Sequence, residues 1–265
     1  MSFIQLITME ADDIITSSQD TESLDATPDM EEDNPTPLLP INCPEKIIVV
    51  MDTSSEMKEA LFKANGTDEA KIRSKLFWVK KCVEMFLRNK SLLNAHHQFA
   101  LVLLQENTCF WYQEFTSNVS LLIESLADVD AAQEKSSPLL FPLDVLLREI
   151  HNNCVLPEKI YGGVAEYVVR VVFVYGRSNP TVVTDKCRQM FQHLRRSPVF
   201  FFDALYVEGK NADESTKDWL HGLDERDDCY FVHGSRSPAQ LFENMAKLLA
   251  HPLQRSIQKH SCHEF

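Results

Sequence analysis

The run Asp52-Thr53-Ser54-Ser55-Glu56 combines residue types that could do chemistry. Neighbouring carboxylate and hydroxyl oxygens are the ligands that a hard cation such as Mg²⁺ prefers. The run follows Ile47–Met51, an apolar stretch typical of a strand buried on both faces. One hypothesis is therefore a metal site at this loop. The other is that Asp52 and Ser54 are turn formers that cap a helix or bond the loop backbone.

Two histidine-containing groups are further candidates for metal ligands: the pair His96–His97, and the terminal residues His251, His260, Cys262 and His263. Adjacent histidines before a strand are typical of a polar boundary. The terminal group lacks a second half at zinc-ligand spacing, and the sequence has no CxxC pair. We expect no zinc site at either place.

The usual enzyme motifs are absent from the sequence, which has no GxGxxG, GxxxxGK[ST], GxSxG or HExxH. Only 7 of 265 residues are glycine, whereas phosphate-binding loops need close backbone approach. No nucleophile–base pair can be argued from the residues. We expect no catalytic residues, no cofactor and no enzyme activity.

Strand-like and helix-like segments alternate from residue 45 onward. Strands are predicted at 47–51, 99–104, 109–115, 167–175, 199–207 and 229–232, and helices at 67–90, 119–126, 142–150, 187–194 and 238–251. Only Gln105–Thr108 separates the second and third strands, so they must form an antiparallel hairpin. The pattern predicts an α/β fold with a doubly wound, mainly parallel sheet and one antiparallel edge strand. Ligands of such sheets bind at the carboxyl ends of the strands, where the Asp52 loop lies.

The end of the last predicted helix is the second candidate site. Pro252 lacks a backbone donor and should stop the helix, so that Leu253-Gln254-Arg255 leaves the core as an extended segment. A rigid proline, an apolar side chain and an arginine make a compact recognition element with a low ordering cost. We expect Pro252, Leu253, Gln254 and Arg255 to bind a partner protein.

Charge is distributed unevenly along the chain, whose net charge is −13. Residues 1–42 hold ten acidic and no basic residues, which leaves −3 for the rest. We predict a disordered acidic arm at 1–42, a domain at 43–251 and a partner-binding tail at 252–265. The acidic arm and the lack of a basic stripe disfavour nucleic-acid binding, and no apolar run is long enough for a membrane helix. The seven scattered cysteines indicate reduced, intracellular thiols.

The predicted topology, with Asp-x-Ser after the first strand, resembles the von Willebrand A domain. That family binds a metal through Asp-x-Ser-x-Ser, a later Thr and an Asp after the fourth strand. Asp52 and Ser54 match, but Glu56 replaces the second Ser, and Leu140-Phe141-Pro142 supplies no Thr. The 167–175 strand runs into Gly176-Arg177-Ser178, where a cation replaces the Asp. We interpret Asp52, Ser54 and Glu56 as a degenerate remnant of that metal site.

Four longer stretches narrow the resemblance: Asn42–Val49 with Asp52, Glu56 and Met57; Tyr167–Arg170; Phe200–Asp203; and Met245–Arg255. They closely resemble the MERIT-type subunit of the BRISC and BRCA-A deubiquitinase complexes, over roughly residues 41–258. That family also has Glu at the position of Glu56.

The resemblance implies a scaffold without catalysis of its own. The family's complexes contain a JAMM-type zinc deubiquitinase that cleaves lysine-linked ubiquitin chains, an Abraxas-type scaffold and a BRE-type subunit built from ubiquitin-E2-variant domains. The Pro-x-x-Arg element at Pro252–Arg255 would dock on such a domain. The resemblance further implies cytoplasmic and nuclear locations and roles in the DNA damage response, checkpoint and mitosis. A metal-dependent ligand-binding A domain is the alternative.

Overall fold

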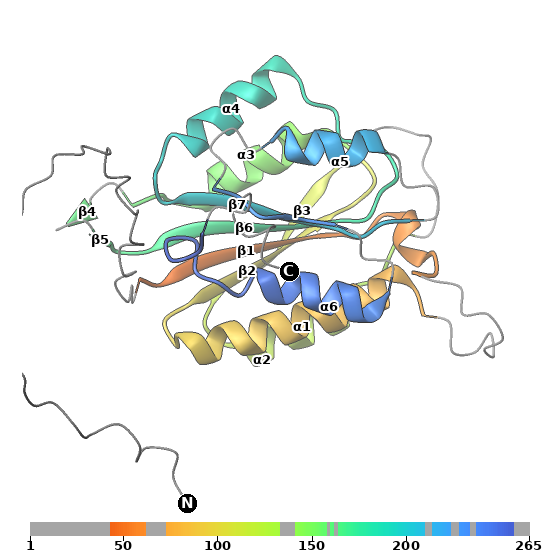
Figure 1. Ribbon diagram of the computed structural model, residues 1–265, viewed down its shortest axis with the longest axis horizontal. Helices are drawn as coiled ribbons and strands as arrows, with labels where there is room; N and C mark the ends of the chain where they lie inside the picture. The colour runs from red at the N-terminus through yellow and green to blue at the C-terminus, as the bar shows by residue number, and fades with distance from the viewer. Residues whose placement is uncertain are drawn as a thin grey trace, which may run out of the picture. The chain divides into compact units, whose positions relative to one another are not determined.

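A six-stranded sheet forms the centre of the computed structural model, which describes residues 43–61, 73–132, 141–157, 160–161, 164–209, 214–223, 228–233 and 237–256. The strand order is β3-β2-β1-β6-β7-β8 (Figure 1). The strands are β1 (Glu45–Asp52), β2 (Gln98–Leu104), β3 (Cys109–Thr116), β6 (Val168–Tyr175), β7 (Phe200–Tyr206) and β8 (Phe231–Val232). β4 (Ile160–Tyr161) and β5 (Val164–Ala165) form a separate antiparallel pair.

All neighbouring strands of the large sheet run parallel except β2 and β3. The short link between these two strands is closed by the Gln105 N–H, which donates to the Thr108 carbonyl at 2.9 Å. β1 and β6 are apolar over nearly their whole length because helices cover both faces of the sheet. The predicted fold class is confirmed, including the antiparallel strand at the edge.

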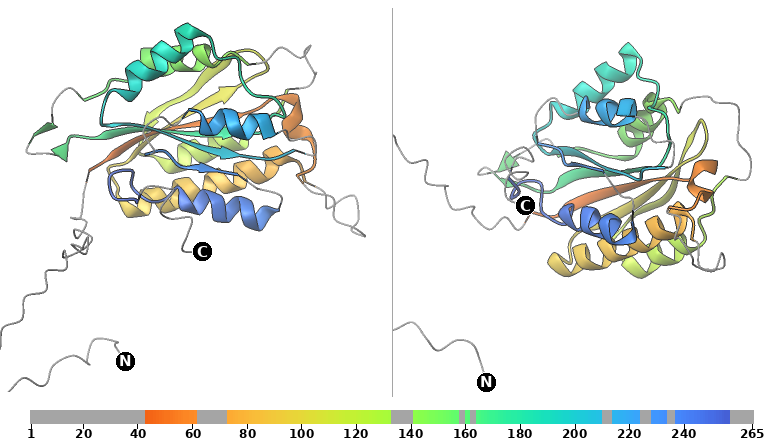
Figure 2. Two further views of the ribbon diagram at one scale, coloured as in Figure 1. Left: turned by 45° about the horizontal axis from the view of Figure 1, so that its top comes forward. Right: turned by 45° about the vertical axis from the view of Figure 1, so that its right-hand side comes forward.

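Helices form one layer on each face of the sheet (Figures 1 and 2). One layer contains α1 (Lys75–Leu93), α2 (Val119–Ala127) and α6 (Pro238–Lys247), and the other contains α3 (Leu143–Asn153), α4 (Asp185–Arg195) and α5 (Glu214–His221). A single 3₁₀ turn, η1 (Ser55–Lys58), follows β1. Side-chain oxygens of Ser74, Asn118, Thr184 and Ser237 accept the N–H three residues on and so begin four of these helices.

Alternating side chains of the strands feed two apolar cores, one under each helix layer. Ile47, Val49 and Met51 of β1 pack with α1 and α6, whereas Ile48 and Val50 pack with α3 and α4. The strand period of two therefore assigns each residue of β1 to one core or the other. Because both faces of β1 are buried, this strand packs against both helix layers.

Several predicted boundaries were wrong. The first helix begins at Lys75 rather than Thr67, because extended Ser74 caps it. Pro142 is the N-cap of α3 and not its first helical residue. The last helix ends at Lys247 instead of His251. After Lys247 the N–H groups of Leu248 and Leu249 donate to the carbonyls three residues earlier, those of Met245 and Ala246, instead of four residues earlier. The helix α5 was not predicted at all.

Candidate functional site

The carboxyl end of the sheet holds the Asp52 loop, as predicted. Asp52 is fully buried at the end of β1. One carboxylate oxygen accepts from the Ser54 N–H at 3.0 Å and from Arg177 Nε at 3.1 Å, and the other accepts from the Gly176 N–H at 3.1 Å. The loops after β1 and β6 are thus joined through one carboxylate.

Arg177 supplies the positive charge beside that carboxylate. Its side chain is 7% exposed, and its other nitrogens donate to the carbonyls of Gln105 and Glu106 at 2.5 and 2.6 Å. The guanidinium also lies 5.2 Å from the centre of the Phe141 ring. Arg177 therefore ties the loop after β2 to the loops after β1 and β6, and its cation lies at the carboxyl ends of the strands, where ligands of such sheets bind.

Glu56 and Ser54 complete the predicted remnant. The Glu56 carboxylate accepts from the Ser178 N–H at 3.0 Å and from the Ser178 hydroxyl at 2.6 Å. The Ser54 hydroxyl is buried and makes no hydrogen bond with the residues that the structure describes. Within the same residues, no group of three or more His, Cys, Asp or Glu side chains is placed to hold a metal. The geometry matches a structural tie between three loops.

The amino end of the sheet holds a second charged site, which sequence reasoning missed. Five charged side chains are buried together there: Glu45, Lys90, Arg170, Asp203 and Arg255. Arg170 is central, since its Nη1 lies 3.2 Å from a Glu45 oxygen and its Nε lies 2.6 Å from an Asp203 oxygen. Lys90 pairs with the other Glu45 oxygen. We call these five residues the charge cluster.

Burial and pairing set the ionisation of the cluster. Burial opposes the charged forms of Glu45 and Asp203, but neighbouring cations outweigh it and hold the pKa of both carboxyls below the usual range. For Glu45 these cations are Arg170 and Lys90, and for Asp203 they are Arg170 and Arg255. Burial lowers the pKa of Lys90 to about 8, which leaves it protonated at neutral pH.

Arg255 completes the charge cluster from the C-terminal segment. Its Nη1 and Nη2 donate to the two oxygens of Asp203 at 2.7 and 2.6 Å, and Nη2 also donates to the Asp228 carbonyl at 2.7 Å. The guanidinium stacks 4.1 Å from the centre of the Tyr230 ring, and the side chain is 3% exposed. Arg255 thus fastens the segment to β7.

The expected extended conformation after Pro252 is wrong. The N–H groups of Gln254 and Arg255 donate to the His251 carbonyl at 2.9 and 3.1 Å, which closes a turn. Pro252 is buried, and Leu253 packs on a small core of Cys43, Ala165, Val168, Val199 and Phe201. We also expected this segment to leave the core, and this was wrong, because Arg255 pairs with Asp203 of β7 and holds the segment against the domain. Partner binding by these four residues stays a prediction.

Two neutral histidines hold the turn and β1 in place. His251 Nδ1 accepts from the Leu253 N–H at 3.1 Å, so its Nε2 donates to the Cys43 carbonyl at 3.0 Å. His97 Nδ1 accepts from the Glu45 N–H at 2.8 Å. Burial lowers the pKa of His97 to about 4 and also lowers that of His251. His96 is exposed, and the terminal residues His260, Cys262 and His263 lie outside the described part of the chain.

The signal for the charge cluster was visible in the sequence. Arg170 lies within Val168-Val169-Arg170-Val171-Val172, and Asp203 follows three phenylalanines, so each is a lone charge inside a buried strand. A buried charge requires a partner. The partners could not be named, because the five residues of the charge cluster lie on five separate elements.

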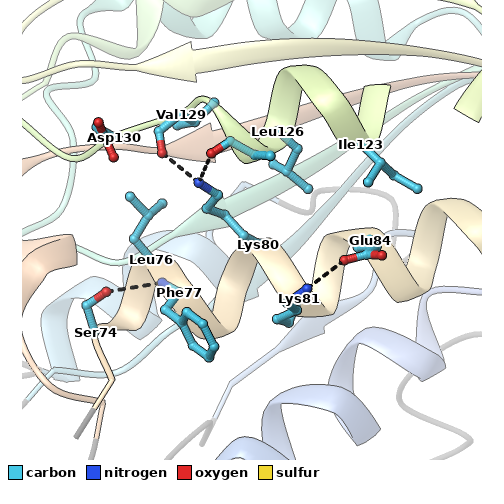
Figure 3. Close-up of a pocket in the computed structure, with 11 residues that line it drawn as sticks. Ser74, Leu76, Phe77, Lys80, Lys81, Glu84, Ile123, Leu126, Val129 and Asp130 are labelled. Atoms are coloured by element: carbon cyan, nitrogen blue, oxygen red, sulfur yellow. Dashed lines mark hydrogen bonds and ion pairs between the residues drawn. The ribbon is translucent and has the colours of Figure 1, made fainter. Parts of the chain in front are cut away.

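A surface groove of about 510 Å³ lies between α1 and α2 (Figure 3). Lys80 points across it and donates to the carbonyls of Ala127 and Val129 at 2.6 and 2.8 Å, which stabilises the C-terminal end of α2. The Ser74 hydroxyl caps α1, and Lys81 pairs with Glu84. The polar groups of the groove therefore serve the helices.

No protein-family model matches the sequence. BRISC and BRCA1-A complex member 1 of Xenopus tropicalis is 33% identical over 236 residues, which cover 84% of this chain and 70% of the relative. The Homo sapiens protein of the same name is 34% identical over 238 residues, which cover 83% and 68%.

Solved structures share the fold at low sequence identity. The SpRpn10 VWA domain has a TM-score of 0.54 at 13% identity and covers 81% of this chain and 98% of its own. A von Willebrand factor type A protein from Catenulispora acidiphila has a TM-score of 0.53 at 12% identity, covering 80% and 43%. The architecture is therefore that of a von Willebrand A domain. Among the described helices, none is both long and apolar enough to cross a membrane.

Proposed function

Because this chain belongs to the family of BRISC and BRCA1-A complex member 1, we propose that it is a non-catalytic scaffold subunit of a deubiquitinase complex. In this proposal it binds the BRE-type ubiquitin-E2-variant subunit. It thereby stabilises an assembly that also holds an Abraxas-type scaffold and a JAMM-type zinc deubiquitinase specific for lysine-linked polyubiquitin. The subunit would act in the cytoplasm and nucleus, in the DNA damage response, checkpoint and mitosis.

The observation that carries the proposal is the relatedness to named complex members over more than four-fifths of the chain. The Asp52 site supports the same view. Its carboxylate, the usual metal ligand of this fold, is occupied by Arg177 and by backbone N–H groups. A chain whose ligand-binding end is closed by its own arginine is suited to binding proteins through other surfaces.

Pro252–Arg255 remains the proposed docking element, but its four residues do not all contact the partner in this proposal. Arg255 is turned inward on Asp203, so it fixes the turn instead of reaching a partner. Leu253 and Gln254 are partly exposed at the tip of that turn. A turn that is already ordered has little conformational entropy left to lose on binding. We therefore assign contact with the partner to Leu253 and Gln254 and positioning of the turn to Arg255.

Titration of the BRE-type subunit against the full chain tests this assignment. Leu253→Ala with Gln254→Ala should weaken binding about tenfold or more, because it removes the contact surface of the turn. Leu92→Ala is the matched control, since Leu92 is 83% exposed on α1. Melting curves of both variants verify folding. Unaltered affinity of the double variant would refute the docking role, and failure of the wild-type chain to bind would refute the proposed partner.

A further inference from the structure

β3 is a long edge strand. In the part of the chain that the structure describes, it pairs only with β2, whereas β8 at the other edge has two residues. Its eight residues include no proline or lysine, the residues that commonly protect an edge. The pairs Val102↔Trp111, Leu103↔Phe110 and Leu104↔Cys109 are in regular register, and the register shifts beyond them, toward Gln113 and Thr116. Over Cys109–Trp111, alternate N–H and C=O groups therefore point away from the sheet, in the spacing that another extended backbone matches.

The two faces of β3 differ in burial. Trp111 and Phe115 contact each other, with ring centres 5.8 Å apart, and pack on the core under α3 and α4. On the other face Phe110 and Tyr112 are 55% and 36% exposed, with ring centres 6.1 Å apart. The strand is thus anchored by one aromatic pair and leaves the other open beside a free edge.

The charge along this edge is negative. Glu114 is exposed and makes no ion pair with any described residue. Glu149 of α3 lies near the start of β3, where burial and then this carboxylate raise the pKa of Cys109 to about 12. The nearby Arg148 is held by Asp144 at 2.7 Å. Lys46 lies on the opposite face of the strand, over the Phe115 and Tyr167 rings. On the face of Phe110 and Tyr112, an approaching strand therefore meets the unpaired Glu114 carboxylate.

We infer that the β3 edge binds an extended segment of another protein, which adds to the sheet as a strand. Its apolar side chains would cover Phe110 and Tyr112, and a lysine or arginine would lie beside Glu114. A second copy of this chain is disfavoured, because two acidic edges would then meet face to face. The inference uses a surface separate from the Pro252–Arg255 turn and does not depend on the proposed function.

Two synthetic peptides test it against the full chain: Lys-Val-Thr-Val-Thr-Val-Lys and the same peptide with Glu in place of both Lys. The lysine peptide should bind about tenfold more tightly than the glutamate peptide and slow hydrogen exchange in Cys109–Thr116. The lysine peptide N-methylated at alternate residues should not bind, since it lacks the donors of a strand. Phe110→Ser with Tyr112→Ser should weaken binding about tenfold. Leu92→Ser with Leu93→Ser, two leucines on α1 that are 83% and 65% exposed, should leave it unchanged.

A charge-swap variant distinguishes specific binding at the β3 edge from nonspecific binding of an apolar peptide. Glu114→Lys keeps the aromatic pair and should reverse the preference, so that the glutamate peptide binds more tightly. Equal binding of the two peptides by the wild-type chain, or absence of protection in β3, would overturn the inference. Self-association in sedimentation that Phe110→Ser with Tyr112→Ser abolishes would also overturn it, because the occupant would then be a second copy.

Discussion

The two ends of the sheet handle buried charge in different ways. At the carboxyl end the Asp52 carboxylate meets one cation, Arg177, and its other partners are backbone N–H groups of neighbouring loops. A second buried cation there, Lys75, donates to the Gly176 carbonyl and pairs with the partly exposed Glu59. At the amino end three cations and two carboxylates are packed together from five separate elements. The first arrangement ties loops that follow adjacent strands. The second joins the first strand of the sheet to the C-terminal turn, so the amino end should contribute more to the stability of the domain.

The largest expected effect tests that difference at Arg255. Arg255→Glu places a third carboxylate in the charge cluster beside Asp203 and should lower the free energy of unfolding by about 3–5 kcal/mol. Urea denaturation measures the loss. Arg88→Glu is the matched control, since Arg88 is 58% exposed and, among the described residues, pairs only with Glu84 in α1. A loss no larger than that of the control would mean that the C-terminal turn is not part of the fold.

A smaller loss is expected at the carboxyl end. Arg177→Met leaves Asp52 without its cation, but water can reach the freed carbonyls of the loops, so we expect a loss of about 2–3 kcal/mol. Asp52→Asn combined with Arg177→Met should recover part of it, because the buried charge is removed together with its partner. Additive effects of the two changes would show that the pair is not coupled.

Acidification tests the comparison because the two histidines that are largely buried in the described part of the chain, His97 and His251, both lie at the amino end. The pKa of His233, just after β8, is also lowered by burial, but its side chain is 46% exposed. The pKa of His97 in the folded state is about 4, below the value near 6.5 of an unfolded chain. Its contribution is therefore complete above about pH 6.5 and is lost as the pH falls toward 4. Between pH 7 and 5 the free energy of unfolding should fall by on the order of 2 kcal/mol, and His251 should add to the loss. His97→Asn, whose oxygen can accept from the Glu45 N–H, should flatten the profile, whereas a flat wild-type profile would contradict the assignment.

The smallest effect concerns metal at the carboxyl end. Magnesium should leave the free energy of unfolding unchanged within about 0.3 kcal/mol, because Arg177 already neutralises Asp52. Isothermal calorimetry gives an independent measurement. Micromolar binding that Asp52→Ala abolishes would restore the alternative function, a metal-dependent ligand-binding A domain, and would break the contrast between the two ends.

The fold could be predicted because it rests on local patterns. The apolar runs of β1 and β6 indicate strands covered on both faces, and the four-residue link Gln105–Thr108 allows only a hairpin. The helix α5 was missed because only Thr216 and Leu220 are buried along its eight residues, so its periodicity is weak.

The candidate sites were only partly predictable for a related reason. Asp52 and Arg177 were identified by residue type. Arg177 was interpreted only as a cation that disfavours a metal ion, whereas in the structure it pairs with Asp52 and neutralises its charge. The conformation after Pro252 was predicted wrongly because a proline stops a helix without specifying where the chain goes next. Its direction is set by Asp203, about fifty residues earlier in the sequence, and pairing at that distance is decided by tertiary packing.

The clasp between Arg255 and Asp203 makes the domain sensitive to the order in which the chain is synthesised. Glu45, Arg170 and Asp203 leave the ribosome well before Arg255. Until Arg255 has emerged, the nascent domain therefore carries the Asp203 carboxylate without its bidentate arginine partner. A product that stops short of Arg255 contains every strand and helix that the structure describes, yet it lacks the contact that closes the amino end of the sheet. Such a product should open more often at β7 and the segment after it, and cellular proteases act on this kind of local opening. Closure of the amino end of the sheet is therefore one of the last contacts that the described part of the chain can make during synthesis.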